Sequence, residues 1–71
     1  MAIINNLKYV NEVPNVRTLV EADYCYNKNY FQIRTYKTGD VKMEFGAKQN
    51  IQIDKQMAKK LIHILNEFIN C

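Results

Sequence analysis

The sequence predicts a small α+β protein: an antiparallel β-meander of four to five strands followed by one C-terminal α-helix. Two observations lead to this prediction. Apolar and polar residues alternate through most of residues 16–53, as side chains on the two faces of a strand do. From Asp54 onward the apolar period lengthens to about 3.6 residues, the period of an amphipathic helix. With 71 residues, the chain is expected to form a single small domain over residues 1–71.

The predicted antiparallel sheet covers residues 16–53. Its strands are expected over residues 16–26, 30–37, 41–45 and 47–53. Polar residues 27–29 have the chemistry of a hairpin turn, residues 38–40 are expected to form a second turn, and Gly46 indicates a bulge or bend. Residues 1–15 alternate only weakly, and Pro14 suits the edge or the start of a strand. An edge strand, a swapped strand and a flexible arm all remain open for residues 1–15.

The predicted helix covers residues 54–70, with Asp54 as its N-cap. Its apolar stripe is wider than one sheet face requires, and consists of Met57, Ala58, Leu61, Ile62, Ile64, Leu65, Phe68 and Ile69. A chain of about 60 residues buries only roughly 60% of the surface that its unfolded form exposes. Oligomerisation often stabilises domains of this size. We therefore expect a homodimer.

Cysteine content and hydropathy indicate the compartment. Cys25 and Cys71 do not make a disulfide framework, so reduced thiols in an intracellular protein are the simpler interpretation. No apolar signal region follows Met1, and no stretch approaches the roughly 20 apolar residues of a membrane span. We expect a cytoplasmic protein that does not enter the membrane.

Residues typical of catalysis are scarce. His63 is the single histidine, and no cysteine or carboxylate stands at a metal-ligand spacing around it. The two glycines, Gly39 and Gly46, cannot form a glycine-rich phosphate loop. A thiol-based sensor built on Cys25 and Cys71 would need a defined site, which their spacing does not indicate. We expect no enzymatic activity, no metal and no cofactor.

The outer face of the predicted sheet has the composition of a nucleic-acid-binding surface. Its residues are Tyr30, Gln32, Arg34, Tyr36, Lys42, Glu44, Lys48, Asn50 and Gln52. Unpaired bases stack on aromatic rings, and basic side chains neutralise phosphates. Residues 28–71 hold eight basic groups against four acidic ones, within a net charge of +3. A solvated face also fits, because tyrosine favours strands and lysine keeps sheet edges soluble.

Residues 30–69 resemble the positive cofactor four family, small transcriptional coactivators that bind single-stranded DNA. The segment FQIRTY matches the family's Ile-Arg-x-Tyr strand through Ile33, Arg34 and Tyr36. The segment AKQNIQI resembles the lysine-rich entry to the next strand through Lys48, and DKQMAKKLIHIL resembles the start of the family's helix. Lys48, Gln49 and Asn50 stand where the family has Lys-Lys-Gly.

The resemblance implies a homodimer whose helices pack together while its curved sheets face a single strand. It implies an accessory role in transcription, replication or repair, with contacts from Arg34, Tyr36 and Lys48. The composition of the outer face adds Tyr30, Lys42 and Asn50. The alternative is a small protein-interaction module, such as a phage or mobile-element regulator or inhibitor of a host complex. A sheet edge or a wide apolar helix would be its docking surface.

Overall fold

The computed structural model describes residues 2–15, 18–43 and 46–71. Over this part of the chain it consists of one four-stranded sheet and one helix, so the α+β class is confirmed. The elements are β1 (Ala2–Ile3), β2 (Glu21–Tyr26), β3 (Tyr30–Tyr36), β4 (Gln49–Asp54) and α1 (Lys55–Ile69).

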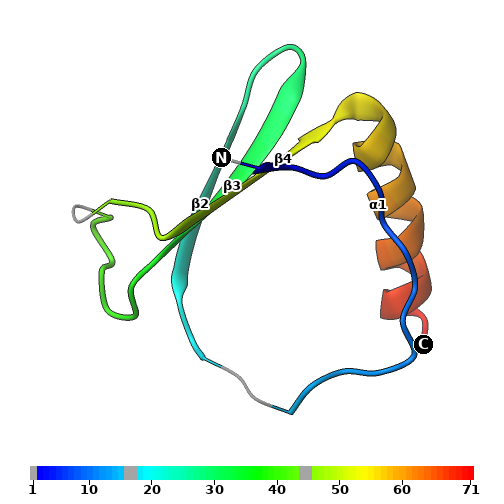
Figure 1. Cartoon of the computed structure of the whole chain (residues 1–71), viewed down its shortest axis with the longest axis horizontal. Coiled ribbons are helices and arrows are strands. Elements are labelled where there is room, and N and C mark those ends of the chain that lie inside the picture. Colours follow the sequence, from blue (N-terminus) through cyan, green and yellow to red (C-terminus); the bar gives the residue numbers. More distant parts are fainter. Residues whose placement is uncertain (1, 16–17, 44–45) are drawn as a thin grey trace.

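The sheet is mixed, with the strand order β1-β4-β3-β2. Strands β2, β3 and β4 form an antiparallel meander, as predicted. Strand β1 instead pairs in parallel with β4, Ala2 lying opposite Ile51, so the prediction of a purely antiparallel sheet is wrong. The long stretch of sequence between β1 and β2 allows this arrangement, because these two strands lie at opposite edges of the sheet (Figure 1). Of the alternatives for residues 1–15, the edge strand is found over Ala2–Ile3.

The first predicted strand is shorter than expected. Strand β2 begins at Glu21, and residues 18–20 before it are not in a strand. Val16 and Arg17, the start of the predicted strand, lie outside the described residues.

The predicted strand over residues 41–45 does not form in its described part. Two successive turns occur there: Asp40 N donates to Lys37 O (3.0 Å) and Met43 N donates to Asp40 O (3.0 Å). Met43 adopts a φ of +57°, which an extended strand does not allow. Strand β4 already occupies the place beside β3, so the alternating Val41 and Met43 have no ladder to join. Residues 44–45 of this predicted strand lie outside the described residues.

The two local turns that the sequence predicts are present. Asn27 N donates to Tyr30 O (2.9 Å), and the Asn27 side-chain oxygen accepts from the N–H groups of Asn29 and Tyr30. In the second turn, the bond from Asp40 to Lys37 places Gly39 third, at a φ of +89°. Glycine adopts this left-handed conformation without steric cost.

Helix α1 follows β4 without a linker. Asp54 caps it, its Oδ1 accepting from Met57 N at 2.8 Å, as predicted. The helix leaves the end of the sheet, and the chain after β1 runs beside it, where Lys60 Nζ donates to Leu7 O at 2.9 Å (Figure 1). The Cα radius of gyration is 13.9 Å, against about 11 Å for a compact domain of this length. The elements therefore do not close around one core.

Few apolar residues are buried. Within the described residues, the buried apolar side chains are Tyr36, 4% exposed, and Ile53, 8% exposed. No residue of α1 is buried. No helix of the described ranges is long and apolar enough to cross a membrane.

Candidate nucleic-acid interface

The register of the sheet defines one polar face. Across β3 and β4, Arg34 lies opposite Asn50 and Gln32 lies opposite Gln52. Across β2 and β3, Asp23 lies opposite Arg34. Because strand side chains alternate, residues two apart share a face with these pairs. We call this set the polar face: Glu21, Asp23, Cys25, Tyr30, Gln32, Arg34, Tyr36, Asn50, Gln52 and Asp54.

Four of the six predicted contact residues come together at one end of the polar face. Arg34 and Asn50 are direct neighbours in the register, and Tyr36 is the next residue on this face of β3. Lys48 N donates to Thr35 O at 2.7 Å, which continues the ladder beyond β4 and brings Lys48 beside the end of β3. This cluster, defined as Arg34, Tyr36, Lys48 and Asn50, is the candidate interface.

The other two predicted contact residues lie elsewhere. Tyr30 is at the far end of β3, four residues from Arg34 and therefore roughly 13 Å away along the strand. It is 44% exposed, so its ring is accessible. Lys42 is exposed in the loop between β3 and β4, and not on a strand as expected.

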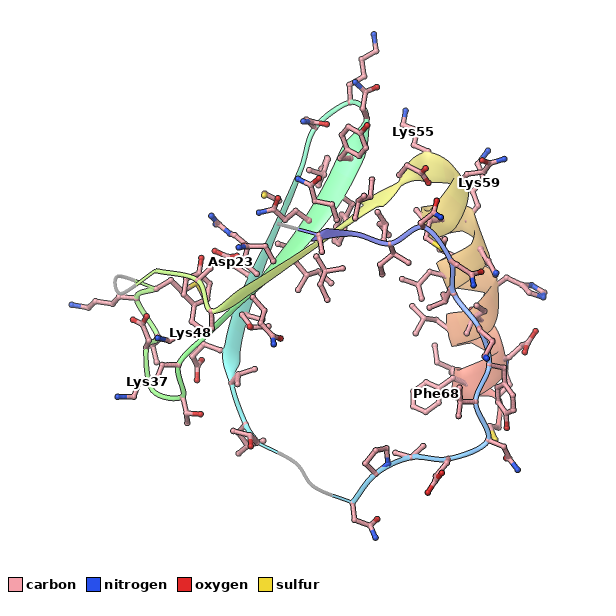
Figure 2. All side chains as sticks on the ribbon, in the orientation of Figure 1. Asp23, Lys37, Lys48, Lys55, Lys59 and Phe68 are labelled. Atoms are coloured by element: carbon pink, nitrogen blue, oxygen red, sulfur yellow. The ribbon has the colours of Figure 1, made fainter. Side chains whose placement is uncertain are left out.

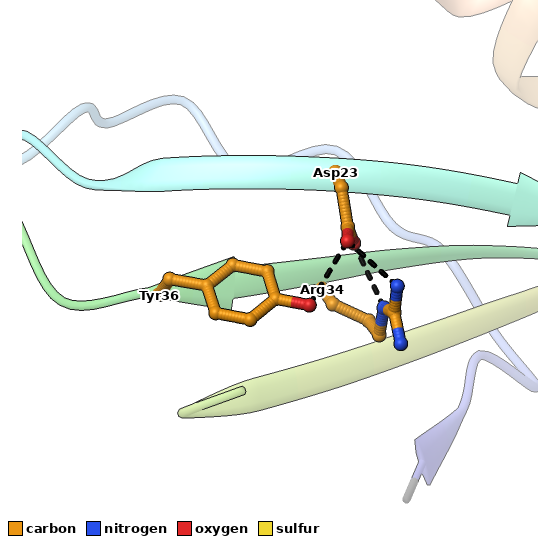
Figure 3. A network of polar contacts seen from close by, with 3 residues as sticks. All are labelled: Asp23, Arg34 and Tyr36. Atoms are coloured by element: carbon orange, nitrogen blue, oxygen red, sulfur yellow. Dashed lines mark hydrogen bonds and ion pairs between the residues drawn. The ribbon is translucent and has the colours of Figure 1, made fainter. Parts of the chain in front are cut away.

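An acidic residue that the sequence analysis did not assign to the site lies at its centre (Figure 3). Asp23 accepts two hydrogen bonds from Arg34, Nε to Oδ1 at 2.8 Å and Nη2 to Oδ2 at 2.6 Å. The Tyr36 hydroxyl donates to the same Oδ2 at 2.9 Å. The available signal was an acidic residue on one antiparallel strand and an arginine on the next, because opposite charges favour facing positions.

The network fixes the charges of its members. Hydrogen bonds from Arg34 hold the pKa of the Asp23 carboxyl below its ordinary value. The same carboxylate raises the pKa of Arg34. Burial, followed by the hydrogen bond to Asp23, raises the pKa of the Tyr36 hydroxyl. Near neutral pH, the centre of the polar face is therefore an ion pair with a neutral tyrosine beside it.

Tyr36 is not the exposed ring that the sequence analysis expected. It is only 4% exposed, and its hydroxyl points to Asp23 from the end of β3 (Figure 3). The guanidinium carbon of Arg34 lies 6.0 Å from the ring centroid, within the range of a cation–π interaction. In this arrangement Tyr36 supports Arg34 and offers no open face to a base.

The basic character of the surface lies around the polar face and not on its strands. The strand positions hold one guanidinium, from Arg34, and the carboxylates of Glu21, Asp23 and Asp54. Lys37 and Lys48 lie at the loop end of the sheet, where they line a cavity of about 490 Å³ (Figure 2). Lys55 and Lys59 lie at the start of α1 (Figure 2). The expected basic sheet face is therefore a basic rim around a face with more acidic than basic groups.

Amide side chains occupy the middle of the polar face. Gln52 Nε2 donates to Gln32 Oε1 at 2.8 Å, joining β4 to β3. Both glutamines line a cavity of about 140 Å³ with Cys25 and Tyr30. Amides donate and accept hydrogen bonds, as the edges of nucleobases also do. This part of the face is chemically suited to contact bases.

The opposite face of the sheet is apolar and largely open. Tyr24 and Tyr26 stack against Phe31, with ring centroids 5.8 and 6.4 Å apart. These tyrosines are 68% and 73% exposed. Within the described residues, the buried part of this face lies at Ile53, which is 8% exposed.

Groups suited to metal binding or catalysis are sparse in the described ranges. No group of three or more His, Cys, Asp or Glu residues there could hold a metal ion. His63 Nε2 lies 3.1 Å from Glu67 Oε1 on the surface of α1. Both cysteines are free and exposed.

Comparison with known proteins gives no relative. No protein-family model, curated protein or solved structure matches this chain. The resemblance to the positive cofactor four family therefore stays a prediction from short motifs, and function is argued from the geometry of the polar face.

Proposed function

We propose that this protein binds single-stranded nucleic acid, most simply DNA, through the polar face, without catalysing a reaction. The observation that carries the proposal is the clustering of Arg34, Tyr36, Lys48 and Asn50 at one end of the sheet. A cytoplasmic accessory role in transcription, replication or repair follows from this proposal and from the family resemblance.

Different residues of this surface are suited to contact phosphates and to contact bases. Lys37, Lys48 and Arg34 lie where they can neutralise successive phosphates along the loop end of the sheet. The amides of Gln32 and Gln52 can meet base edges, and Tyr30 offers an accessible ring. Base stacking on an aromatic ring contributes roughly 1–3 kcal/mol per base. In a single strand the bases are free to turn toward such a surface, whereas in a duplex they are paired and stacked.

The active form that we propose is a homodimer. Large side chains of the apolar sheet face and of α1 remain exposed, including Ile33, Ile51 and Phe68 at 44%, 45% and 74%. Soluble monomers rarely expose contiguous apolar patches larger than a few hundred Å². A second copy that covers the apolar sheet face and the stripe of α1 would leave both polar faces accessible.

The same open apolar surface also favours a second candidate function, that of a protein-interaction module. A heterologous partner could seat a helix or a strand against it. The two candidate functions predict different contents of the purified sample. A homodimer that binds nucleic acid elutes at twice the chain mass and carries ultraviolet absorbance near 260 nm, whereas an interaction module co-purifies with a second protein.

The decisive experiment is fluorescence anisotropy of labelled oligo-dT at low and moderate salt, with a duplex of equal length as the control. We expect tighter binding to the single strand, with an affinity that falls as salt rises because phosphate contacts release counterions. Arg34→Ala combined with Lys48→Ala should weaken binding at least about tenfold, since two charge-assisted contacts are lost.

A matched variant separates this site from general charge. Lys8→Ala combined with Lys60→Ala also removes two positive charges, but from exposed positions outside the polar face and its basic rim. We expect it to retain most of the affinity. Equal losses in the two double variants, or no binding of oligo-dT at low salt, would exclude the polar face as the binding surface.

A further inference from the structure

The carboxylate of Asp23 occupies the Nε–Nη2 edge of Arg34, one of the two edges through which a guanidinium can hold a phosphate. The two residues face each other directly in the register of β2 and β3. Their parallel hydrogen bonds of 2.8 and 2.6 Å form a bidentate pair. A guanidinium presents this same fork to a phosphate group. As long as the pair is closed, Arg34 adds no net positive charge to the candidate interface.

The pair is accessible enough to open. The side chains of Arg34 and Asp23 are 38% and 23% exposed. Ion pairs open to solvent are only weakly favourable, because water and salt screen them. The Tyr36 hydroxyl donates to Oδ2 independently of Arg34, so the carboxylate would keep one donor after the guanidinium had left.

We infer that Asp23 sets the affinity of the polar face by competing with the phosphodiester backbone of a single strand for Arg34. The inference rests on the proposed function. On binding, the guanidinium exchanges a carboxylate for a phosphate, and Asp23 stays hydrogen-bonded to Tyr36. The exchange weakens binding in the natural protein, because a phosphate that takes the Nε–Nη2 edge of Arg34 must displace the internal pair.

The test replaces Asp23 without changing its shape. Asp23→Asn removes the charge but keeps an oxygen that can accept from Tyr36. Glu21→Gln is the matched control, since Glu21 lies on the same face of β2 but opposite Tyr36 and not opposite Arg34. In oligo-dT titrations, we expect Asp23→Asn to tighten binding about five- to tenfold and Glu21→Gln about twofold or less.

A double-mutant cycle shows whether the gain passes through Arg34. In an Arg34→Ala background, Asp23→Asn should improve binding no more than Glu21→Gln does, because the competition has been removed. Equal gains with and without Arg34 would overturn the inference in favour of a general charge effect. Weaker binding by Asp23→Asn would overturn it too, since Asp23 would then hold Arg34 in its binding position.

A measurement on the unaltered protein does not depend on how the variants fold. The NMR signal of the Arg34 Nε–H group should shift when oligo-dT is added, because its acceptor changes from carboxylate to phosphate. An unchanged signal at saturation would overturn the inference. Failure of the natural protein, Arg34→Ala and Asp23→Asn alike to bind oligo-dT would overturn the proposed function as well. Binding that depends on Arg34, with no difference between Asp23→Asn and Glu21→Gln, would remove the inference alone.

Discussion

Ile33 and Ile51 face each other directly across β3 and β4, yet they remain 44% and 45% exposed. The next pair on the same face is Phe31 with Ile53, and Ile53 is only 8% exposed. The cover ends between these pairs because α1 starts immediately after β4 and leaves the sheet (Figure 1). The apolar sheet face beyond Ile53 and the apolar stripe of the helix are therefore both open.

We expect self-association to depend on this open surface. Phe68 is 74% exposed on the inner side of α1 (Figure 2), so Phe68→Glu removes no buried contact within one chain. It should convert the proposed dimer to a monomer in sedimentation equilibrium, while the helical circular dichroism signal is kept. Asn66→Glu is the control, because residues two apart on a helix lie on nearly opposite sides. A natural protein that is monomeric at every concentration would contradict the proposed dimer.

The elements that the sequence predicts well are those decided by local chemistry. Strand β3 matches its prediction to within one residue, because alternation between two turns defines it. Helix α1 is similarly close, since Asp54 caps it and the change of period marks its start. The hairpin turn at Asn27 follows from side-chain hydrogen bonds within three residues.

The features that the sequence analysis missed depend on contacts between distant segments. The parallel pairing of β1 with β4 depends on the path of the chain between β1 and β2. The alternation of apolar and polar residues does not reveal that path. Val41 and Met43 alternate like strand residues, but β4 already occupies the neighbouring position on β3. The role of Asp23 required the register, because only the register places it opposite Arg34. The sequence predicts six contact residues on one face, whereas the register shows which of them lie together and which acidic residue faces Arg34.

The stability of the hairpin between β2 and β3 should depend on the side chain of Asn27. Its side-chain oxygen accepts from Asn29 N and Tyr30 N, both at 2.9 Å. Asn27→Ala should reduce the free energy of unfolding by about 1 kcal/mol, since net contributions of such bonds are of this size. Asn27→Asp keeps the acceptor and should retain most of the stability. Urea denaturation followed by circular dichroism measures the free energy of unfolding of both variants. Equal losses of stability in Asn27→Ala and Asn27→Asp would show that the side-chain acceptor is not what stabilises the turn.

The start of α1 should depend on the cap at Asp54. Its Oδ1 accepts from Met57 N at 2.8 Å, satisfying one of the free N–H groups of the first turn. Asp54→Ala should cost about 1 kcal/mol of unfolding free energy, whereas Asp54→Asn, an equally good cap, should cost little. Thermal or urea unfolding of the three proteins compares them, and an unchanged midpoint for Asp54→Ala would mean that the cap does not limit stability.

The ion pair of Asp23 and Arg34 should make stability depend on pH in the acidic range. The folded pKa of Asp23 lies below its ordinary value of 3.8, so the unfolded chain binds this proton more readily. The stabilisation is therefore complete above about pH 4 to 5 and is lost as pH falls through the folded pKa. The natural protein and Asp23→Asn should differ less in urea midpoint below about pH 4 than at neutral pH. The pH dependence that arises from carboxyl groups present in both proteins cancels in this difference. In an Arg34→Ala background the narrowing should be much smaller, because the main cause of the lowered pKa is gone. A constant difference from pH 7 to the acid limit would contradict a stabilising role for this pair.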